Sequence, residues 1–330
     1  MKRERKTIYK EIIQAVRSSQ SILITGHEDP DGDSIGSELA LGRIIDQLGR
    51  KVTIVNKGRV PIKYGFLPEI DRAIEFRDFR DQPAFDLALI LECPGIERTG
   101  LVKNLIGAGT KIINIDHHPD NRPFGLINYI DENASSVGEM LYELFVAEEL
   151  SIDKDTAILL YTAILTDTGR FRFDSTSPRT MGIIGELIAR GVNPRVITDY
   201  IYFALPPPIL KLTGEALSGI SFFENGRICL LQVDRKMLEK NMVNMSEMDG
   251  LADYTLFARD VIVGGLLKEM EAGFTKVSLR SRNGINVSQL AHKYGGGGHF
   301  SAAGFGIALP LNVARERLLE DLKELVNASI

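Results

Sequence analysis

The chain has 330 residues, 44% of them hydrophobic, and a formal net charge of -5. This length predicts about two domains, and the apolar fraction is enough for two ordinary cores. The negative balance excludes a protein that coats long duplex nucleic acid, because that binding mode needs many Lys and Arg contacts to phosphates. A short anionic substrate is compatible with it.

Cysteine usage and the N-terminus indicate the compartment. Only Cys93 and Cys229 are present, far apart and without a CxxC spacing, which excludes a disulfide framework and a cysteine zinc site. The expected environment is the reducing cytoplasm. The basic start MKRERK runs into the amphipathic IYKEIIQAV, which argues against a secretory signal. No stretch approaches the roughly 20 apolar residues of a membrane span, so no membrane partner is expected.

Strand-like and helix-like segments alternate through the first half of the chain. This alternation predicts an α/β fold with a doubly wound, mainly parallel sheet. Short apolar runs rich in branched residues predict buried strands at residues 21–25, 52–56, 87–91 and 111–115.

Helical spacing of apolar residues predicts the elements between these strands. The first such helix follows Asp33, with Asp33 or Ser34 as its N-cap and Gly49 as its stop. Further helices are predicted over about residues 136–150, 154–166 and 178–189.

The composition changes at ALPPPIL, where three consecutive prolines cannot continue a helix. We therefore predict a catalytic domain over residues 1–195, a linker over 196–212 and a smaller α+β domain over 213–330. In this second domain, ICLLQV, DVIVGGLL and TKVSLRSR are predicted strands, whereas NVSQLAHKY and VARERLLEDLKELV are predicted helices.

Acidic and histidine side chains follow three of the predicted strands directly. In an open parallel sheet, ligands gather beyond the carboxyl ends of the strands, so these side chains predict one site. Asp167 ends a predicted helix, where the helix dipole disfavours a negative charge unless a cation is close. The residues that follow strands are His27, Asp31, Asp33, Glu92, Asp116, His117 and His118.

Parts of this set could instead have purely structural roles. The aspartates of the loop GHEDPDGDS could make turns and cap the next helix, and Asp33 could both cap that helix and hold a metal ion. Glu92 could merely end a strand, and His117 and His118 could be ordinary surface histidines. Pooled together, carboxylates and imidazoles without a thiolate suit Mn²⁺, with Mg²⁺, Fe²⁺ or Zn²⁺ as competitors. The ligands outnumber the needs of one ion, and two ions about 3.5 to 4 Å apart are suited to phosphoester hydrolysis.

The second half of the chain offers candidate substrate contacts. Along the predicted strand 276–282 the side chains alternate, so Ser278, Arg280 and Arg282 share the face opposite the core. Guanidinium groups on one face fit a phosphate or a stacked base, although arginines exposed on a strand could simply be solvated. A similar case exists for Arg172, which would lie on one side of GRFRF if that segment is extended.

A run of four glycines, Gly295 to Gly298, is closed by His299. Backbone without side chains can approach a phosphate closely, and the imidazole would add a donor. A flexible linker is the competing interpretation, but the apolar FSAAGFGIAL that follows is untypical of a linker. The predicted contacts are Gly296, Gly297, Gly298 and His299.

Taken in order, GHEDPDGDS, the Asp116–His118 triplet, TDTG at Asp167 and GGGGHFSAAG resemble the DHH phosphoesterases that carry a DHH-associated C-terminal domain. The resemblance covers nearly the whole chain. Length and domain order are similar to the stand-alone nano-RNase and pAp phosphatase branch. The implied function is hydrolysis of short oligoribonucleotides, of 3′-phosphoadenosine 5′-phosphate (pAp), or of both, to mononucleotides. The resemblance also allows a homodimer.

The family pattern assigns roles to individual positions of this sequence. It implies that two Mn²⁺ ions share the acid of the second motif, and that His118 faces the phosphate while Asp116 orients the histidines. It also favours Arg280 as a substrate contact. One ion would be held by His27 and Asp31, and the other by Asp33, His117 and Asp167.

The sequence departs from the family pattern at the shared acid. The second motif usually has Asp there, whereas LILECPG offers Glu92, which keeps the charge and adds a methylene. Two other functions stay open. One is a phosphodiesterase for linear or cyclic dinucleotides, and the other is a catalytically weakened module that senses a nucleotide, for which Glu92 is the sequence hint.

Overall fold

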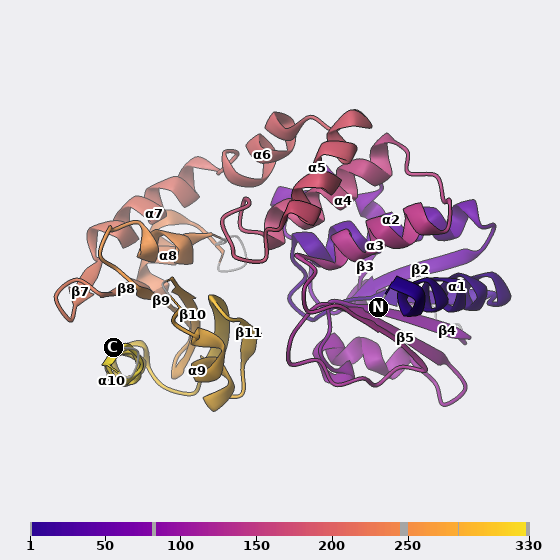
Figure 1. Cartoon of the computed structure of the whole chain (residues 1–330). Coiled ribbons are helices and arrows are strands. Elements are labelled where there is room, and N and C mark those ends of the chain that lie inside the picture. Colours follow the sequence, from indigo (N-terminus) through magenta and orange to yellow (C-terminus); the bar gives the residue numbers. More distant parts are fainter. Residues whose placement is uncertain (1, 81–83, 245–249, 283, 328–330) are drawn as a thin grey trace. The chain divides into compact units, whose positions relative to one another are not determined.

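The computed structural model describes residues 2–80, 84–244, 250–282 and 284–327. The chain divides into two compact units, Met1–Ala204 and Leu205–Ile330, each with a six-stranded sheet (Figure 1). Within the described ranges, no helix has the length and apolar character needed to cross a membrane.

The sheet of the first unit is parallel throughout, with the strand order β3-β2-β1-β4-β5-β6. The predicted α/β fold with a doubly wound parallel sheet is therefore confirmed. The direction of strand progression reverses between β1 and β4, and in open α/β sheets this is where ligands bind beyond the carboxyl ends. The strands are β1 (Ser21–Thr25), β2 (Lys51–Asn56), β3 (Ala73–Glu75), β4 (Leu87–Leu91), β5 (Lys111–Asp116) and β6 (Ile127–Ile130).

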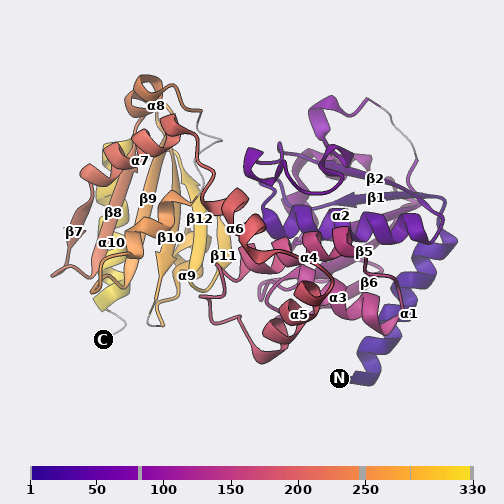
Figure 2. The same ribbon diagram turned by 90° about the horizontal axis from the view of Figure 1, so that it is seen from above.

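Helices cover both faces of this sheet. On one face lie α2, α3 and α4, with α5 outside them (Figure 2). On the other face the 3-10 helix η4 buries Val102 against Leu23, Val55 and Ala88. The helices are α1 (Lys2–Ser18), α2 (Gly32–Gln47), α3 (Val137–Ala147), α4 (Lys154–Asp167), α5 (Pro178–Ala189) and α6 (Pro194–Tyr202); the 3-10 turns are η1 (Ile62–Tyr64), η2 (Ile70–Arg72), η3 (Phe76–Asp78) and η4 (Ile96–Leu105).

Small residues let α2, α3 and α4 approach closely. A Cβ added at Gly36 of α2 would lie 2.6 Å from the carbonyl oxygen of Leu159 in α4. One added at Gly138 of α3 would lie 2.5 Å from the Cβ of Ala163. The starts of α2 and α3 and the end of α4 are therefore held together at the carboxyl edge of the sheet.

The start of α2 differs from the prediction. Its N-cap is Asp31, whose side chain accepts a hydrogen bond from the backbone N–H of Ser34, so the predicted cap at Asp33 or Ser34 is wrong. Because the helix begins earlier, Asp33 lies in its first turn and its side chain is available for other partners. Gly49, at φ 72°, follows the helix end as predicted.

The second unit has a mixed sheet in the order β11-β12-β10-β9-β8-β7, in which only β8 and β9 pair in parallel among the described strands. Helices α9 and α10 pack on one face, and α7, α8 and η6 on the other. The elements are α7 (Pro207–Ser218), β7 (Ser221–Phe223), β8 (Ile228–Val233), α8 (Arg235–Asn241), η6 (Leu251–Leu256), β9 (Val263–Glu271), β10 (Phe274–Ser281), α9 (Val287–Lys293), β11 (Gly297–His299), β12 (Ala302–Ile307) and α10 (Leu311–Asn327).

The proline run lies at a helix start. Pro207 and Pro208 occupy the first turn of α7, where backbone N–H groups have no partner within the helix and proline is tolerated. The segment predicted as a linker, residues 196–212, thus holds most of α6 and the beginning of α7.

Candidate metal centre

Four of the predicted ligands lie together at the carboxyl edge of the first sheet. Asp33, Glu92 and His117 offer ligand atoms that all lie within 4.8 Å of one another. Asp167 adjoins them, because its Oδ2 is 3.4 Å from His117 Nε2. These side chains come from the first turn of α2, the ends of β4 and β5, and the last residue of α4.

The carboxylate of Asp33 is fully buried and fixed by the start of α3. Its Oδ2 accepts a hydrogen bond from the backbone N–H of Val137 at 2.7 Å, and its Oδ1 from that of Gly138 at 2.9 Å. Ser37 also donates to Oδ1 at 2.9 Å. Each carboxylate oxygen has two lone pairs, so Oδ2 can still bind a cation.

His117 is held with one ring nitrogen toward the acidic residues. Its Nδ1 is 3.1 Å from the carbonyl oxygen of Ala134, and a carbonyl can only accept, so Nδ1 carries a proton. If the ring is neutral, Nε2 then carries a lone pair and no proton. This atom lies 2.9 Å from Glu92 Oε1. Acceptor atoms this close require a proton or a cation among them.

Glu92 is a buried acid with one carboxylate oxygen that lacks a hydrogen-bond partner. It is 2% exposed, and its Oε1 makes no hydrogen bond of acceptable geometry. Burial raises its pKa well above the ordinary value, and His117 opposes this only in part. A buried carboxylate oxygen without a hydrogen bond, facing imidazole and two further carboxylates, fits a divalent cation.

The pKa of Asp167 is raised by the same cause as that of Glu92. Burial is the main cause that raises its pKa to about 8, and the nearby Asp33 and Asp31 add to it while His117 opposes it. Without a cation, this carboxyl therefore keeps its proton near neutral pH.

The raised pKa of Asp167 predicts how pH affects the metal-free protein. Between the ordinary value of 3.8 and about 8, the folded chain holds a proton that the unfolded chain has lost. Stability therefore falls as pH rises through this window. In the presence of a chelator, we expect the melting temperature to fall as the pH is raised from about 5 to about 8. Saturating Mn²⁺ should make the melting temperature less dependent on pH. A metal-free melting temperature that rises or stays level would contradict this, and Asp167→Asn should reduce the slope.

His27 and Asp31 form a pair beside the cluster. Their Nε2 and Oδ2 atoms are 3.7 Å apart, and the charges of both act on Asp167. The His27 Nδ1 is buried without a hydrogen bond. In the described part of the chain, neither residue belongs to a group of three potential ligands with mutual contact distances.

His118 and Asp116 form a second arrangement that includes Glu92. His118 Nδ1 lies 2.7 Å from Asp116 Oδ1, and Asn121 donates to Asp116 Oδ2 at 2.5 Å. Burial would raise the pKa of Asp116, but the bonds from His118 and Asn121 lower it overall. Asp116 therefore stays ionised, and a proton transfer by His118 would have to use Nε2.

Several groups that shape this site escaped the sequence prediction. The carbonyl of Ala134 and the N–H groups of α3 are backbone atoms, which have no residue signature. The buried Glu38 accepts from Ser34 Oγ at 2.9 Å and from Asn56 Nδ2 at 2.6 Å, and Asn56 Oδ1 accepts in turn from the N–H of Gly26, which links the start of the His27 loop to α2. Burial raises the pKa of Glu38 to about 7. In the sequence, Glu38 could have been noticed as an acid among the apolar positions of a predicted helix.

In the second unit, most of the predicted substrate residues share one face of the sheet. Arg280 pairs with Ala302 and Ala302 with His299, whereas Ser278 pairs with Gly304 and Gly304 with Gly297. Side chains that pair directly across strands point to the same side. Between Arg280 and His299, this face therefore presents only small residues and bare backbone.

Both arginines of the predicted strand have partners within the unit. Arg280 Nε donates to Asp253 Oδ1 at 2.9 Å. Arg282 lies beyond the end of β10, and its Nη2 donates to the carbonyls of Leu256 and Ala258. Arg282 therefore holds the end of η6 in place through these two carbonyls. From the sequence, its guanidinium is expected to bind a substrate phosphate.

The glycine run is part of the sheet, so the linker interpretation is wrong. Gly295, at φ 75°, ends α9. A Cβ at Gly296 would lie 2.1 Å from the carbonyl oxygen of Gly304, and one at Gly298 would lie 2.6 Å from that of Ala302. These glycines let β11 lie directly against β12, which leaves their backbone at a sheet edge.

The segment that contains Arg172 is not extended. Arg170 and Phe171 have φ values of 64° and 63°, which turn the chain back instead of alternating its side chains. The guanidinium of Arg170 stacks 4.8 Å above the Tyr202 ring. Arg172 is exposed, and the expected shared side of an extended GRFRF segment is therefore wrong.

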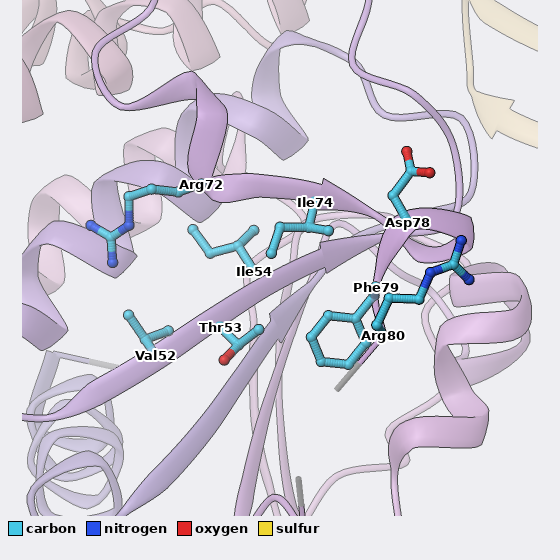
Figure 3. A pocket seen from close by; sticks show the side chains of 8 residues that line it. All are labelled: Val52, Thr53, Ile54, Arg72, Ile74, Asp78, Phe79 and Arg80. Carbon is cyan, nitrogen blue, oxygen red and sulfur yellow. The ribbon is translucent and has the colours of Figure 1, made fainter. Parts of the chain in front are cut away.

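A pocket of about 450 Å³ lies on β2 and β3 of the first unit (Figure 3). Arg72 in its wall is already paired with Asp46 and Glu69. None of its residues belongs to the acidic and histidine cluster. The lining consists of Val52, Thr53, Ile54, Arg72, Ile74, Asp78, Phe79 and Arg80.

Known proteins share both units. Residues 21–164 match the DHH family, N-terminal domain, and residues 225–329 match the DHHA1 domain. A relative from Thermus thermophilus, named bifunctional oligoribonuclease and PAP phosphatase NrnA, is 32% identical over 329 residues, which cover 97% of this chain and 94% of the relative.

Solved structures share the fold. An exopolyphosphatase-related protein from Bacteroides fragilis has a TM-score of 0.90 at 23% identity, over 98% of this chain and 97% of the other. The exonuclease RecJ bound to manganese has a TM-score of 0.54 at 18% identity, over 98% and 93%. Together, the fold, the acidic edge and these matches define a phosphoester hydrolase. The chain belongs to the DHH family, as its motifs predict, and it carries a DHHA1 domain.

Proposed function

We propose that this chain is a divalent-metal-dependent phosphoesterase that hydrolyses short oligoribonucleotides, pAp, or both, to mononucleotides. The observation that carries the proposal is the buried group of Asp33, Glu92 and His117, joined by Asp167. It occurs in a chain that aligns over 97% of its length with a relative named for both activities.

The ligand set supports Mn²⁺ as the resident ion, with Mg²⁺, Fe²⁺ and Zn²⁺ as alternatives, because oxygen donors dominate and imidazole completes them. Asp33, Glu92, His117 and Asp167 would hold one ion. His27 and Asp31, together with Glu92, would hold the other. Two bound ions would lower the pKa of a water molecule and neutralise charge on the phosphoryl oxygens.

The side chains around this cluster have separate tasks in the proposal. Asp116 keeps the His118 ring oriented through the 2.7 Å bond to Nδ1. The Nε2 of His118 would donate a proton to the leaving oxygen, which makes His118 the general acid. The bond from Nδ1 of His117 to Ala134 keeps its other nitrogen toward the acids.

The second unit would supply contacts to the substrate phosphates. Ser278, Arg280 and His299 offer donors on one sheet face, and the backbone of Gly296, Gly297 and Gly298 can approach an anion without side chains in the way. Arg282 is left to brace η6, and Arg172 is not part of this set. A cytoplasmic location agrees with two free, buried cysteines.

A substrate panel tests the proposal. Purified protein with Mn²⁺ is offered pAp, linear dinucleotides, cyclic dinucleotides and RNA of increasing length. We expect release of mononucleotides from pAp or from the shortest RNAs, with rates that fall as the RNA lengthens. Turnover of cyclic dinucleotides alone would favour the phosphodiesterase alternative. Tight nucleotide binding without turnover under any divalent ion would favour a sensing module.

A further inference from the structure

The turn η6, which packs on the same face of the second sheet as Arg280, is followed by an exposed aromatic ring. Phe257 directly follows η6 and is 65% exposed. Its ring centroid is 4.8 Å from that of Tyr254, with 37° between the ring planes. Phe257 also lies outside the hydrophobic clusters of the described residues. Core packing therefore does not explain its position.

The backbone beneath this ring is held firmly. Arg282 donates to the carbonyls of Leu256 and Ala258, the residues on either side of Phe257. Arg280 binds Asp253, earlier in the same turn, at 2.9 Å. Arg280 of β10 and Arg282, just beyond its end, thus fix a short segment whose most exposed side chain is aromatic.

Close packing adds to this restraint. Leu251, Ala252, Thr255 and Leu256 are buried, and Thr255 lies so near β9 that a Cβ added at Gly264 would be 2.0 Å from its Oγ1. The turn is therefore preorganised, and a ring presented from it loses little conformational freedom when a ligand binds.

We propose that Phe257, with Tyr254 beside it, is the platform on which a nucleobase of the substrate stacks. This inference rests on the proposed function. The turn that carries the ring binds Arg280 through Asp253, and Arg280 shares its sheet face with Ser278 and His299, so the phosphate donors and the aromatic side chain belong to one side of the sheet. A nucleotide combines an anion with a π face and matches both.

Stacking also sets the expected specificity. Every base has a π face, so stacking on a ring tolerates changes of base. The platform should therefore require the presence of a base and not its identity. Arg280 and Arg282 act here as positioning residues for the segment, in addition to any direct contact that Arg280 makes with a phosphate.

The test compares substrates with and without a base in the full-length chain. With Mn²⁺, we expect Phe257→Ala to raise KM for a diribonucleotide about tenfold, and to leave kcat within about twofold. KM for the analogue in which an abasic ribose replaces one nucleoside should not change. Phe257→Trp should restore the wild-type KM. Phe274→Ala is the matched control, because Phe274 is 37% exposed at the first residue of β10, the end of the strand remote from Arg280.

The outcomes separate this inference from the proposed function. If the wild-type protein hydrolyses no nucleotide, the proposed function fails, and binding of AMP and of ribose 5-phosphate by calorimetry then tests the platform. Weaker binding of AMP alone in Phe257→Ala supports the platform. Equal changes for both ligands, or no change for either, overturn it. A change of oligomeric state in Phe257→Ala, measured by light scattering, would assign the ring to a second copy of the chain and also overturn it.

Discussion

Replacing His117 with alanine is expected to lower kcat for pAp or short RNA by about a thousandfold or more, because a lost ion removes several kcal/mol of transition-state stabilisation. The Nε2 of His117 lies 2.9 Å from Glu92 and 3.4 Å from Asp167, so alanine would leave these buried acids without an imidazole between them. Both kcat and Mn²⁺ affinity are measured, the latter by calorimetry.

The matched control is His292→Ala in the second unit. His292 is exposed on α9 and does not belong to the acidic cluster. Its replacement should leave Mn²⁺ affinity unchanged. If His117→Ala binds Mn²⁺ as tightly as the wild-type protein, His117 is not a ligand. Circular dichroism separates such a result from a loss of fold, which is a risk at a site that is 4% exposed.

The elements predicted best from the sequence are those with a regular pattern of apolar residues. Buried strands such as Leu87–Leu91 are continuous apolar runs, so both their position and the polar residues that follow them were readable. The parallel order then brings the strand ends to one edge, which places Glu92 near His117 although neither residue alone identifies a partner.

What the sequence did not predict depends on contacts between distant segments. Asp31 and Asp33 are both aspartates at a helix start, and only the closeness of α3 determines that Asp33 turns toward Val137 while Asp31 caps. Arg282 continues the alternation of β10, yet the nearby η6 captures it. Phe257 follows an irregular turn without periodicity, so no pattern distinguished it from a core phenylalanine.

Replacing Glu92 with glutamine is expected to change stability and activity in opposite directions. In the metal-free protein, Glu92 Oε1 and His117 Nε2, 2.9 Å apart, must share a proton, and the amide of glutamine can replace that arrangement with an N–H that donates to a neutral imidazole. It also removes an acid whose ionisation burial disfavours. The melting temperature of the first unit in the presence of a chelator should therefore rise by about 2 to 4 °C, since about 1 kcal/mol shifts a unit of roughly 200 residues, such as Met1–Ala204, by that amount.

With Mn²⁺ present, the same change should be harmful. A neutral amide is a weaker ligand than a carboxylate, so the Mn²⁺-induced rise in melting temperature should shrink, and kcat should fall by about a hundredfold or more. This trade of stability against function is typical of a buried catalytic group. A lower melting temperature in chelator, or unchanged turnover, would show that Glu92 has a structural role.

Replacing Glu92 with aspartate tests length separately from charge. Glu92 has φ 55°, a left-handed conformation that aspartate adopts more readily than glutamate, so the backbone should accept the change. The carboxylate keeps its charge and retreats by about 1.5 Å, one C–C bond. Because the resemblance to the family motif implies aspartate at this position, activity should be retained or raised in Glu92→Asp. A loss as large as that of Glu92→Gln would instead show that this site is built for the longer acid, with the left-handed turn at the end of β4 setting the main chain back to accommodate it.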